Sequence, residues 1–185
     1  MWKEVFPVNV SRPIEPVTPE EFEAMDKDER LNYELIDGIV LMSPRPNEKH
    51  QRILFNLSGE IYALLKKDKR CQGYTEFEMR VDDNILIPDL MIICDQDKLT
   101  HQQYLGAPLI VFEILSPSTT QYDLLYKLNK YKSVGVAEYW ILDPKAQTIT
   151  VHNYVDNEAS IYIIGDTIYS KAIPEVIITV ADIFA

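Results

Sequence analysis

Two apolar stretches in the middle of the chain each contain a single carboxylate, and they constrain the fold more than any other feature. The first is Ile85–Cys94, around Pro88-Asp89, and the second is Leu109–Leu115, around Glu113. Both are rich in β-branched and aliphatic residues, as expected of strands that are covered on both faces. A charge inside a buried strand costs folding free energy unless it is paired or binds a metal. Two such charges in neighbouring strands therefore indicate a chemical site.

A helix is predicted directly after the second stretch. It covers Gln121–Val134, with Ser118 or Thr119 as its N-cap and Gly135 as its C-terminal signal. The helix carries Lys127, which brings an ammonium group close in sequence to the second buried acid. A proline within the first stretch, at position 88, also indicates an edge strand or a bulge, where a strand can redirect a side chain.

A longer helix is predicted before the two apolar stretches. Asn47 can cap a helix of about five turns that reaches Lys69. Four apolar residues follow the spacing of one buried face: Leu54, Leu57, Ile61 and Leu64. His50 lies one turn before Leu54 on the same stripe.

Short-range signals define the remaining elements. Thr18 and Glu21 fit a capping box at the start of a short helix, and Asp37-Gly38 is a hairpin signal between two apolar runs. Further strands are predicted at Tyr74–Val81, Glu138–Leu142, Thr148–Tyr154, Ile161–Ile164 and Val176–Val180. The central order of helix, three strands, helix and strand indicates an α/β fold with a mixed sheet.

The length and composition are those of one globular domain. A chain of 185 residues can bury about two-thirds of its surface. Hydrophobic residues at 46% and charged residues at 25% exclude the disordered class. No apolar run approaches the roughly 18 residues that a membrane-spanning helix needs. We expect an extended arm over residues 1–18, a core over residues 30–155 and C-terminal strands over residues 156–185.

The two cysteines, Cys71 and Cys94, have neither the spacing of metal ligands nor the pattern of a disulfide framework. Such cysteine usage suits a reducing compartment, and no signal-peptide pattern opens the chain. A cytoplasmic protein is therefore expected.

The net charge of −11 disfavours nucleic acid as a partner, because Lys and Arg dominate the binding of phosphates. Most of that charge lies in residues 1–30 and 143–185, so the central part of the chain is closer to neutral. An acidic site that binds a divalent cation also reverses its local field. The charge therefore weakens the case for nucleic acid without excluding it.

The chemistry that two strand carboxylates and a lysine can perform is metal-assisted hydrolysis of a phosphodiester. Such hydrolysis needs a cation that polarises the phosphoryl oxygen, a positioned water and a group that absorbs developing charge. Mg²⁺ is held by one or two carboxylates and keeps several waters. Asp89 and Glu113 are the candidate metal ligands, and Lys127 is the candidate group that assists the attacking water.

The spaced residues that carry this chemistry resemble a known family. They are Tyr33-Glu34-Leu35-Ile36-Asp37-Gly38, Ser43-Pro44, His50, Pro88-Asp89, Phe112-Glu113-Ile114-Leu115-Ser116-Pro117-Ser118, Asp123, Lys127, Tyr131 and Glu138-Tyr139-Trp140. Over roughly residues 30–155 this set resembles the Uma-two family of endonucleases within the PD-(D/E)XK nuclease superfamily.

The resemblance implies a restriction endonuclease-like core and an Mg²⁺- or Mn²⁺-dependent endonuclease whose substrate is DNA. Enzymes that cut both strands are often dimers, which makes a homodimer the expectation. The superfamily pattern places a lysine two residues after the glutamate, where this chain has Leu115. Lys127, from the following helix, is then the matching candidate.

Each candidate residue also has a purely structural interpretation. Asp89 can accept hydrogen bonds from backbone donors at a bulge, and Glu113 can pair with a buried Lys or Arg. Lys127 stands four residues after Asp123, the favourable order for a pair on a helix surface. Three more residues have a functional and a structural interpretation. Glu34 is a third acid near the metal or an exposed position, and His50 supports the site or bonds a carbonyl at the core edge. Tyr131 contacts the substrate or packs in the core.

Three functions are compatible with these residues. The first is the metal-dependent DNA endonuclease just described. The second is a catalytically inactive module with a nuclease fold that acts in binding or regulation, which the missing strand lysine and the acidic surface favour. The third is a metal-dependent hydrolase that acts on a nucleotide or a small phosphoester.

Overall fold

The computed structural model describes residues 15–67, 70–116 and 121–185, and for residues 121–123 it describes the backbone alone. Its helices are α1 (Pro19–Ala24), α2 (Glu48–Leu65), α3 (Gln121–Val134) and α4 (Val180–Phe184), with a short 3₁₀ turn at Gln96–Lys98. Most of the expected N-terminal arm and the expected caps at Ser118 and Thr119 lie outside the described residues.

The larger sheet has six strands in the described part of the chain, in the order β11-β10-β9-β8-β6-β3. Their bounds are β3 (Gln72–Thr75), β6 (Leu90–Ile93), β8 (Ile110–Ile114), β9 (Glu138–Asp143), β10 (Thr148–Asn153) and β11 (Glu158–Tyr162). Strands β8 and β9 are parallel, and the other neighbours are antiparallel. The expected core order is confirmed, because α2, the three strands β3, β6 and β8, then α3 and β9 follow one another around this sheet.

A second sheet of five described strands has the order β2-β1-β5-β4-β7. Its strands are β1 (Leu31–Ile36), β2 (Ile39–Pro44), β4 (Glu78–Val81), β5 (Asn84–Leu86) and β7 (Gln103–Leu105). Near the C-terminus, β12 (Thr167–Tyr169) and β13 (Ile177–Thr179) form a separate antiparallel pair.

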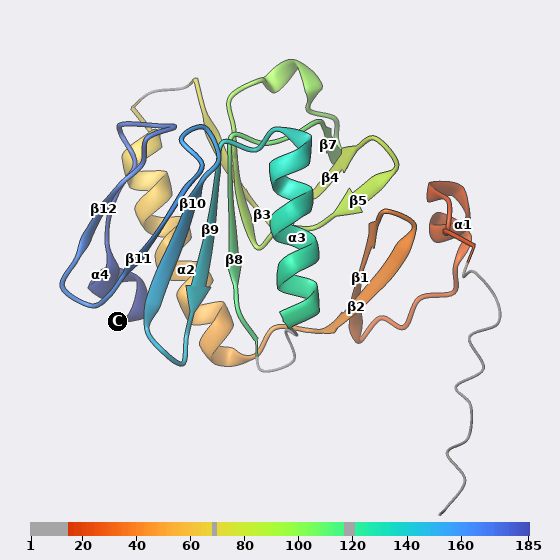
Figure 1. The fold of residues 1–185 in the computed structure, drawn as a ribbon, viewed down its shortest axis with the longest axis horizontal. Helices are drawn as coiled ribbons and strands as arrows, with labels where there is room; N and C mark the ends of the chain where they lie inside the picture. The colour runs from red at the N-terminus through yellow and green to blue at the C-terminus, as the bar shows by residue number, and fades with distance from the viewer. Residues whose placement is uncertain (1–14, 68–69, 117–120) are drawn as a thin grey trace, which may run out of the picture.

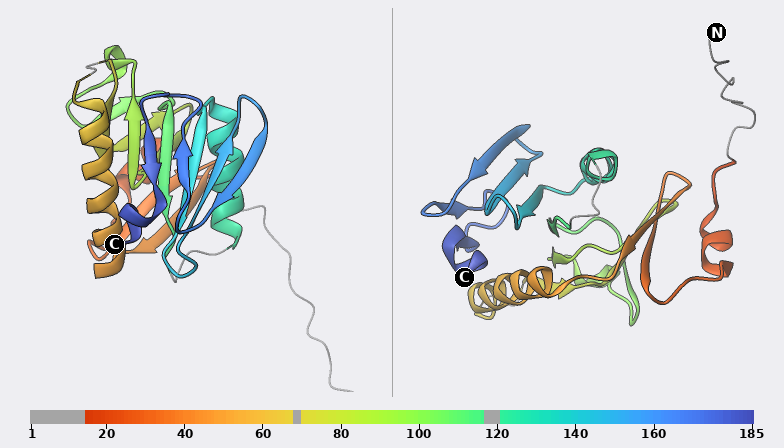
Figure 2. Two further views of the ribbon diagram at one scale, coloured as in Figure 1. Left: turned by 90° about the vertical axis from the view of Figure 1, so that its left-hand side faces the viewer. Right: turned by 90° about the horizontal axis from the view of Figure 1, so that it is seen from below.

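Helices cover both faces of the six-stranded sheet (Figures 1 and 2). On one face, α2 and α4 pack over a core that includes Phe112 and Trp140. On the other face, α3 packs over a second core that includes Val111 and Tyr131 and extends into the five-stranded sheet. Side chains alternate between the faces of a strand, so odd-numbered residues of β8 face α3. This alternation decides which helix Glu113 faces.

Several local predictions are confirmed. Thr18 and Glu21 form the capping box of α1, and the Asn47 side chain accepts a hydrogen bond from the backbone N–H of His50 at the start of α2. Asp37 and Gly38 form the turn between β1 and β2, with φ values of 50° and 74°. Pro16 packs so closely on this turn that a Cβ at position 38 would lie 2.3 Å from the Cβ of the proline.

The predicted strands Tyr74–Val81 and Ile85–Cys94 are each broken in two. They pair in one register throughout, with Thr75 opposite Leu90 in the larger sheet and Met79 opposite Leu86 in the smaller one. Between these pairs both arms of the hairpin bend. One bend contains Glu76, with φ at 47°, and the other contains Pro88, whose missing N–H interrupts the ladder. Because the stretch Ile85–Cys94 is apolar almost throughout, its sequence was predicted as one strand, although it passes from the five-stranded sheet to the six-stranded sheet.

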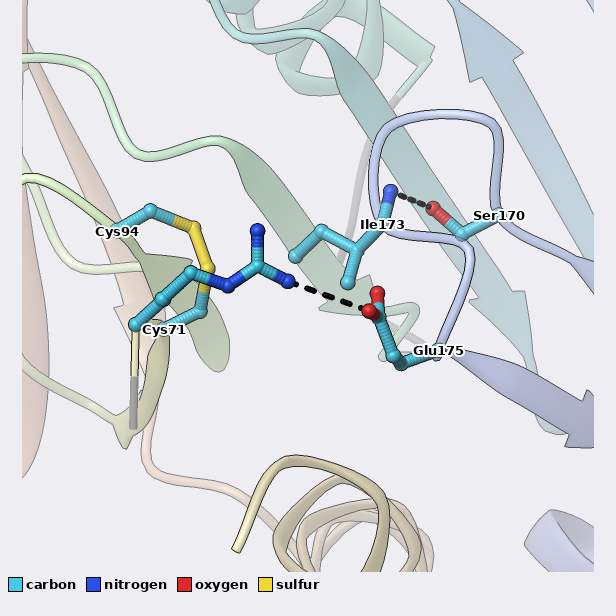
Figure 3. The surroundings of a disulfide bond; sticks show 6 residues. Cys71, Cys94, Ser170, Ile173 and Glu175 are labelled. Atoms are coloured by element: carbon cyan, nitrogen blue, oxygen red, sulfur yellow. Dashed lines mark hydrogen bonds and ion pairs between the residues drawn. A yellow bond between two sulfur atoms is a disulfide. The ribbon is translucent and has the colours of Figure 1, made fainter. Parts of the chain in front are cut away.

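The expectations for the cysteines and the C-terminus were wrong in part. Cys71 and Cys94 form a disulfide across the ends of β3 and β6, with Cα atoms 4.1 Å apart (Figure 3). The cysteine argument for a reducing compartment therefore does not hold. The last predicted strand is shorter than expected, because Val180 begins α4, which packs beside α2. Of the helices in the described ranges, none combines the length and apolar character needed to span a bilayer.

Candidate active site

The two strand acids face each other across neighbouring strands. β6 and β8 are antiparallel, with Leu90 opposite Phe112. One step further along the same register places Asp89 opposite Glu113, and directly opposite residues point to the same face of a sheet. That face is the one covered by α3. The acids predicted from sequence therefore lie together, on the same side of the sheet.

Asp89 is held by a backbone group and by a histidine. Its Oδ2 accepts a hydrogen bond from the backbone N–H of Ile114 at 2.6 Å and lies 3.1 Å from Nε2 of His50. Burial lowers the pKa of His50, but the hydrogen bond and charge of Asp89, together with Glu113 and Glu76, outweigh burial and raise that pKa. The bend in the hairpin thus gives Asp89 a fixed orientation, which α2 reinforces through His50.

Glu113 is held by two groups from α3. Nζ of Lys127 lies 2.9 Å from Oε1 of Glu113, and the hydroxyl of Tyr131 donates to the same oxygen at 2.7 Å. The ammonium group also lies 2.8 Å from Oε2 of Glu34, on β1. The other carboxylate oxygen of Glu34 accepts a hydrogen bond from the backbone N–H of Ile87 at 2.9 Å. Lys127 therefore bridges acids from both sheets.

The electrostatics of this cluster favour a bound cation. Burial raises the pKa of Glu113 to about 7; Lys127 opposes the rise, while the charges of Asp89 and Glu34 add to it. Burial would lower the pKa of Lys127, but Glu113 and Glu34 raise it well above its ordinary value, so the lysine is charged at neutral pH. Three carboxylates thus share one ammonium group and one histidine, which leaves an excess of negative potential.

A cleft of about 110 Å³ opens onto this cluster. Its lining includes Glu34, His50, Asp89, Glu113, Lys127 and Tyr139. Among the residues that the structure describes, two buried side-chain polar atoms have no hydrogen-bond partner, Nδ1 of His50 and the hydroxyl of Tyr139. Both belong to residues of this cleft. A buried polar group without a partner costs folding free energy, so these two atoms are available for hydrogen bonds to a ligand in the cleft.

The donor set fits Mg²⁺ or Mn²⁺. In the described part of the chain, no three His, Cys, Asp or Glu side chains form a ready-made metal cluster. Mg²⁺ does not need three protein ligands, because it is commonly held by one or two carboxylates and otherwise by water. Asp89 and Glu113 are two carboxylates on one face, and the raised pKa of Glu113 reflects the negative charge that a cation would neutralise.

Two exposed cations are sequence neighbours of residues that line the cleft. Arg45 stands between two prolines that line the cleft, and Lys49 precedes His50. Arg45 donates to the backbone carbonyl of Glu29 at 3.1 Å, and Lys49 donates to that of Pro144 at 2.6 Å. Within the described ranges, neither forms an ion pair with a carboxylate.

The structure brings most of the predicted site residues together. Lys127 pairs with Glu34 and Glu113, and the side chain of Asp123, its expected surface partner, lies outside the described residues. Tyr131 is buried as expected, but its bond to Glu113 was missed. Its position one helical turn after Lys127 was the signal that could have revealed it. Tyr139 was also missed, since an alternating core strand does not show which hydroxyls are unpaired.

Known proteins share this sequence pattern and this fold. Residues 19–181 match the model of the Uma2 family, described as "Putative restriction endonuclease". An uncharacterised protein of Synechocystis sp. is 25% identical over 134 residues, which cover 71% of this chain and 70% of that protein. The crystal structure of a "putative nuclease belonging to DUF820" from Anabaena variabilis has a TM-score of 0.79 and 22% identity, covering 91% of this chain and 98% of that chain.

Proposed function

Because the chain belongs to the Uma2 family of restriction endonuclease-like proteins, we propose that it is a divalent-metal-dependent endonuclease that hydrolyses DNA. The observation that carries the proposal is the convergence of Asp89 and Glu113 from adjacent strands on one cleft, with Lys127 2.9 Å from Glu113. Two carboxylates buried side by side cost folding free energy even with Lys127 and His50 as partners, so their presence beside a cleft supports a functional role.

In this proposal Asp89 and Glu113 hold Mg²⁺ or Mn²⁺. When bound, the cation supplies Lewis-acid polarisation of the phosphoryl oxygen and lowers the pKa of a bound water. His50 and the backbone N–H of Ile114 keep the Asp89 carboxylate oriented, and Tyr131 does the same for Glu113. Fixed ligands of this kind reduce the reorganisation needed when the substrate arrives.

Lys127 acts as a charged donor rather than as a general base. Its raised pKa keeps the ammonium group protonated at neutral pH, so it cannot accept a proton from water. A protonated amine can orient the attacking water and stabilise negative charge that develops on the phosphoryl group. Glu34 fixes the lysine from the opposite side, at 2.8 Å.

Arg45 and Lys49 support a polyanionic substrate. Both are exposed and next in sequence to residues of the cleft lining, and neither charge is neutralised by a carboxylate within the described residues. By contrast, Arg30, Arg70 and Arg80 form ion pairs with acidic side chains. In a chain with a net charge of −11, unpaired cations beside the cleft are placed where they can bind phosphates.

A cleavage assay on supercoiled plasmid tests the proposal. The wild-type protein should nick or linearise the plasmid with Mg²⁺ or Mn²⁺ and should be inactive in excess chelator. Asp89→Asn and Glu113→Gln should each abolish cleavage. Asp97→Asn, which changes an exposed acid of the 3₁₀ turn, is the matched control and should cleave as the wild type does. Cleavage that persists in both cleft variants would refute the proposal.

A catalytically inactive binding module is the second candidate. Leu115 occupies the strand position where the superfamily pattern has a lysine, and this observation favours it. Such a module would bind DNA without turnover in the presence of any divalent metal. The same plasmid assay, run beside a binding measurement on a DNA duplex, separates the two functions.

A further inference from the structure

The hydroxyl of Tyr139 is a buried donor that has no partner. Tyr139 is 0% exposed, it lies on β9, and it lines the cleft beside the two acids. The other nearby tyrosines are satisfied: Tyr131 donates to Glu113, and Tyr154 donates to the backbone carbonyl of Leu128 at 2.8 Å. A phenylalanine would fill the same space as Tyr139 without leaving a polar group unpaired.

The strand pairing places Tyr139 on the face of the sheet that carries Glu113. β8 and β9 are parallel, with Val111 paired to Tyr139 and Glu113 paired to Ile141. Val111 and Glu113 lie on the same face of β8, two residues apart, so Tyr139 also lies on that face. Its side chain stands diagonally across from Glu113, within reach for a large aromatic residue.

Packing fixes the direction of the ring. The ring of Tyr131 lies 4.9 Å from that of Tyr139, at an interplanar angle of 53°. On the other side His152 stacks against Tyr139, with ring centroids 6.2 Å apart. A ring packed against two other rings is restricted in orientation, so the hydroxyl keeps its position in a residue that lines the cleft.

The surroundings define the group that this hydroxyl can meet. Burial, followed by the charge of Glu113, raises the pKa of Tyr139 well above its ordinary value, so it is a neutral donor. The lining of the cleft includes the three carboxylates of Glu34, Asp89 and Glu113, which repel a free anion. Oxygen acceptors therefore enter together with a cation, and a phosphoryl group bound through a divalent metal has that chemistry.

We propose that the hydroxyl of Tyr139 donates a hydrogen bond to a phosphoryl oxygen of the bound phosphodiester. The inference rests on the proposed function for the identity of the ligand, but it assigns a binding role to a residue of the core strand. It also predicts an unusual pair of effects. Loss of the hydroxyl should weaken ligand binding while leaving the fold as stable as before, or more stable, because the unpaired donor is removed.

The test compares three Tyr→Phe variants by two measurements. The first is the free energy of unfolding in denaturant, without metal. The second is the affinity for two probes, inorganic phosphate in Mg²⁺ and a short DNA duplex in Ca²⁺, each measured by calorimetry. Tyr139→Phe is the test, Tyr131→Phe removes a satisfied bond inside the site, and Tyr154→Phe removes a satisfied bond outside the cleft.

Tyr139→Phe should bind both probes about ten- to a hundredfold more weakly than the wild type, with no loss of stability. Tyr154→Phe should lose stability and keep its binding, and Tyr131→Phe should lose both. Equal binding by Tyr139→Phe and the wild type overturns the inference, as does a wild-type protein that binds neither probe. A wild type that binds phosphate without cleaving DNA removes the proposed function but leaves the role of Tyr139 measurable.

Discussion

The ammonium group of Lys127 lies 2.9 Å from the carboxylate of Glu113, although the two residues come from different elements. In the superfamily pattern the lysine follows the glutamate by two residues, on the same face of the strand. Here Leu115 holds that position, and α3, packed on the same face of the sheet as Glu113, brings an amine to the acid. An ammonium group thus lies beside the glutamate without coming from the strand.

Replacement of Lys127 tests whether its ammonium group contributes to activity and to stability. Lys127→Met should reduce cleavage by about a hundredfold or more, because the charge beside the phosphoryl group is lost. It should also lower the free energy of unfolding by about 3 kcal/mol, because Glu34 and Glu113 stay buried without their cation. Plasmid cleavage and chemical unfolding measure the two effects. Lys132→Met, on the exposed side of α3, is the control, and equal activity in the two variants would argue against a role for Lys127.

The pH dependence of stability should report Glu113. In the unfolded chain this carboxyl titrates near pH 4.5, whereas in the folded protein its pKa is about 7. Between these two pH values the folded state binds more protons than the unfolded chain does. The stabilisation that comes from protonated Glu113 is therefore complete below pH 4.5 and is lost as the pH rises through about 7.

Unfolding in chelator at several pH values measures this effect. The wild type should lose stability relative to Glu113→Gln as the pH rises between 4.5 and about 7. Excess Mg²⁺ should offset the loss, because the cation binds the ionised carboxylate. If the free energy of unfolding in chelator changed with pH in the same way for both proteins, Glu113 would be ionised over the whole pH range measured.

The two cations next in sequence to the cleft lining should contribute to the salt dependence of DNA binding. Arg45→Gln and Lys49→Gln should each reduce the slope of log K against log salt by about 1, without altering the fold. Binding of a DNA duplex in Ca²⁺ at several salt concentrations gives the slope. Lys66→Gln and Lys67→Gln, exposed at the other end of α2, are the controls. If all four variants have the wild-type slope, the DNA lies elsewhere.

Glu138 should contribute to the fold rather than to the chemistry. It is 1% exposed, and its carboxylate accepts hydrogen bonds from Trp140, Ser170 and the backbone N–H groups of Lys171 and Ala172. Glu138→Ala should lower the free energy of unfolding by about 3 kcal/mol or more, because these donors lose their acceptor. Chemical unfolding is the measurement. Glu158→Ala, which removes an exposed partner of Lys171, should cost less than about 1 kcal/mol.

Sequence reasoning was most successful where one residue controls the local backbone. Asp37-Gly38 predicted the turn of the first hairpin, and Asn47 predicted the start of α2. The limits of α3 also matched, from Gln121 to Val134. In each case the signal is a capping or turn preference that depends on neighbours in sequence, which a single chain displays directly.

The features that were missed depend on partners distant in sequence. Pro88 indicated an edge or a bulge, but it does not show that the apolar stretch around it serves two sheets, because both sheets bury the same kinds of side chain. The Cys71–Cys94 disulfide joins residues 23 positions apart, and only the pairing of β3 with β6 brings them together. Likewise, the bond from Tyr131 to Glu113 and the unpaired hydroxyl of Tyr139 exist only once α3 is packed on the sheet.

The bend in the long hairpin gives the cleft a mechanical property. Asp89 lies at the point where the chain leaves one sheet for the other, while Glu34 and Lys127 connect the smaller sheet to α3. Because the backbone N–H of Ile114 ties Asp89 to the strand of Glu113, a change in the angle between the two sheets would shift Glu34 relative to these two acids, and we expect a ligand that contacts all three acids to alter that angle. A pair of spectroscopic labels, one on each sheet, would then register occupancy of the cleft from a distance.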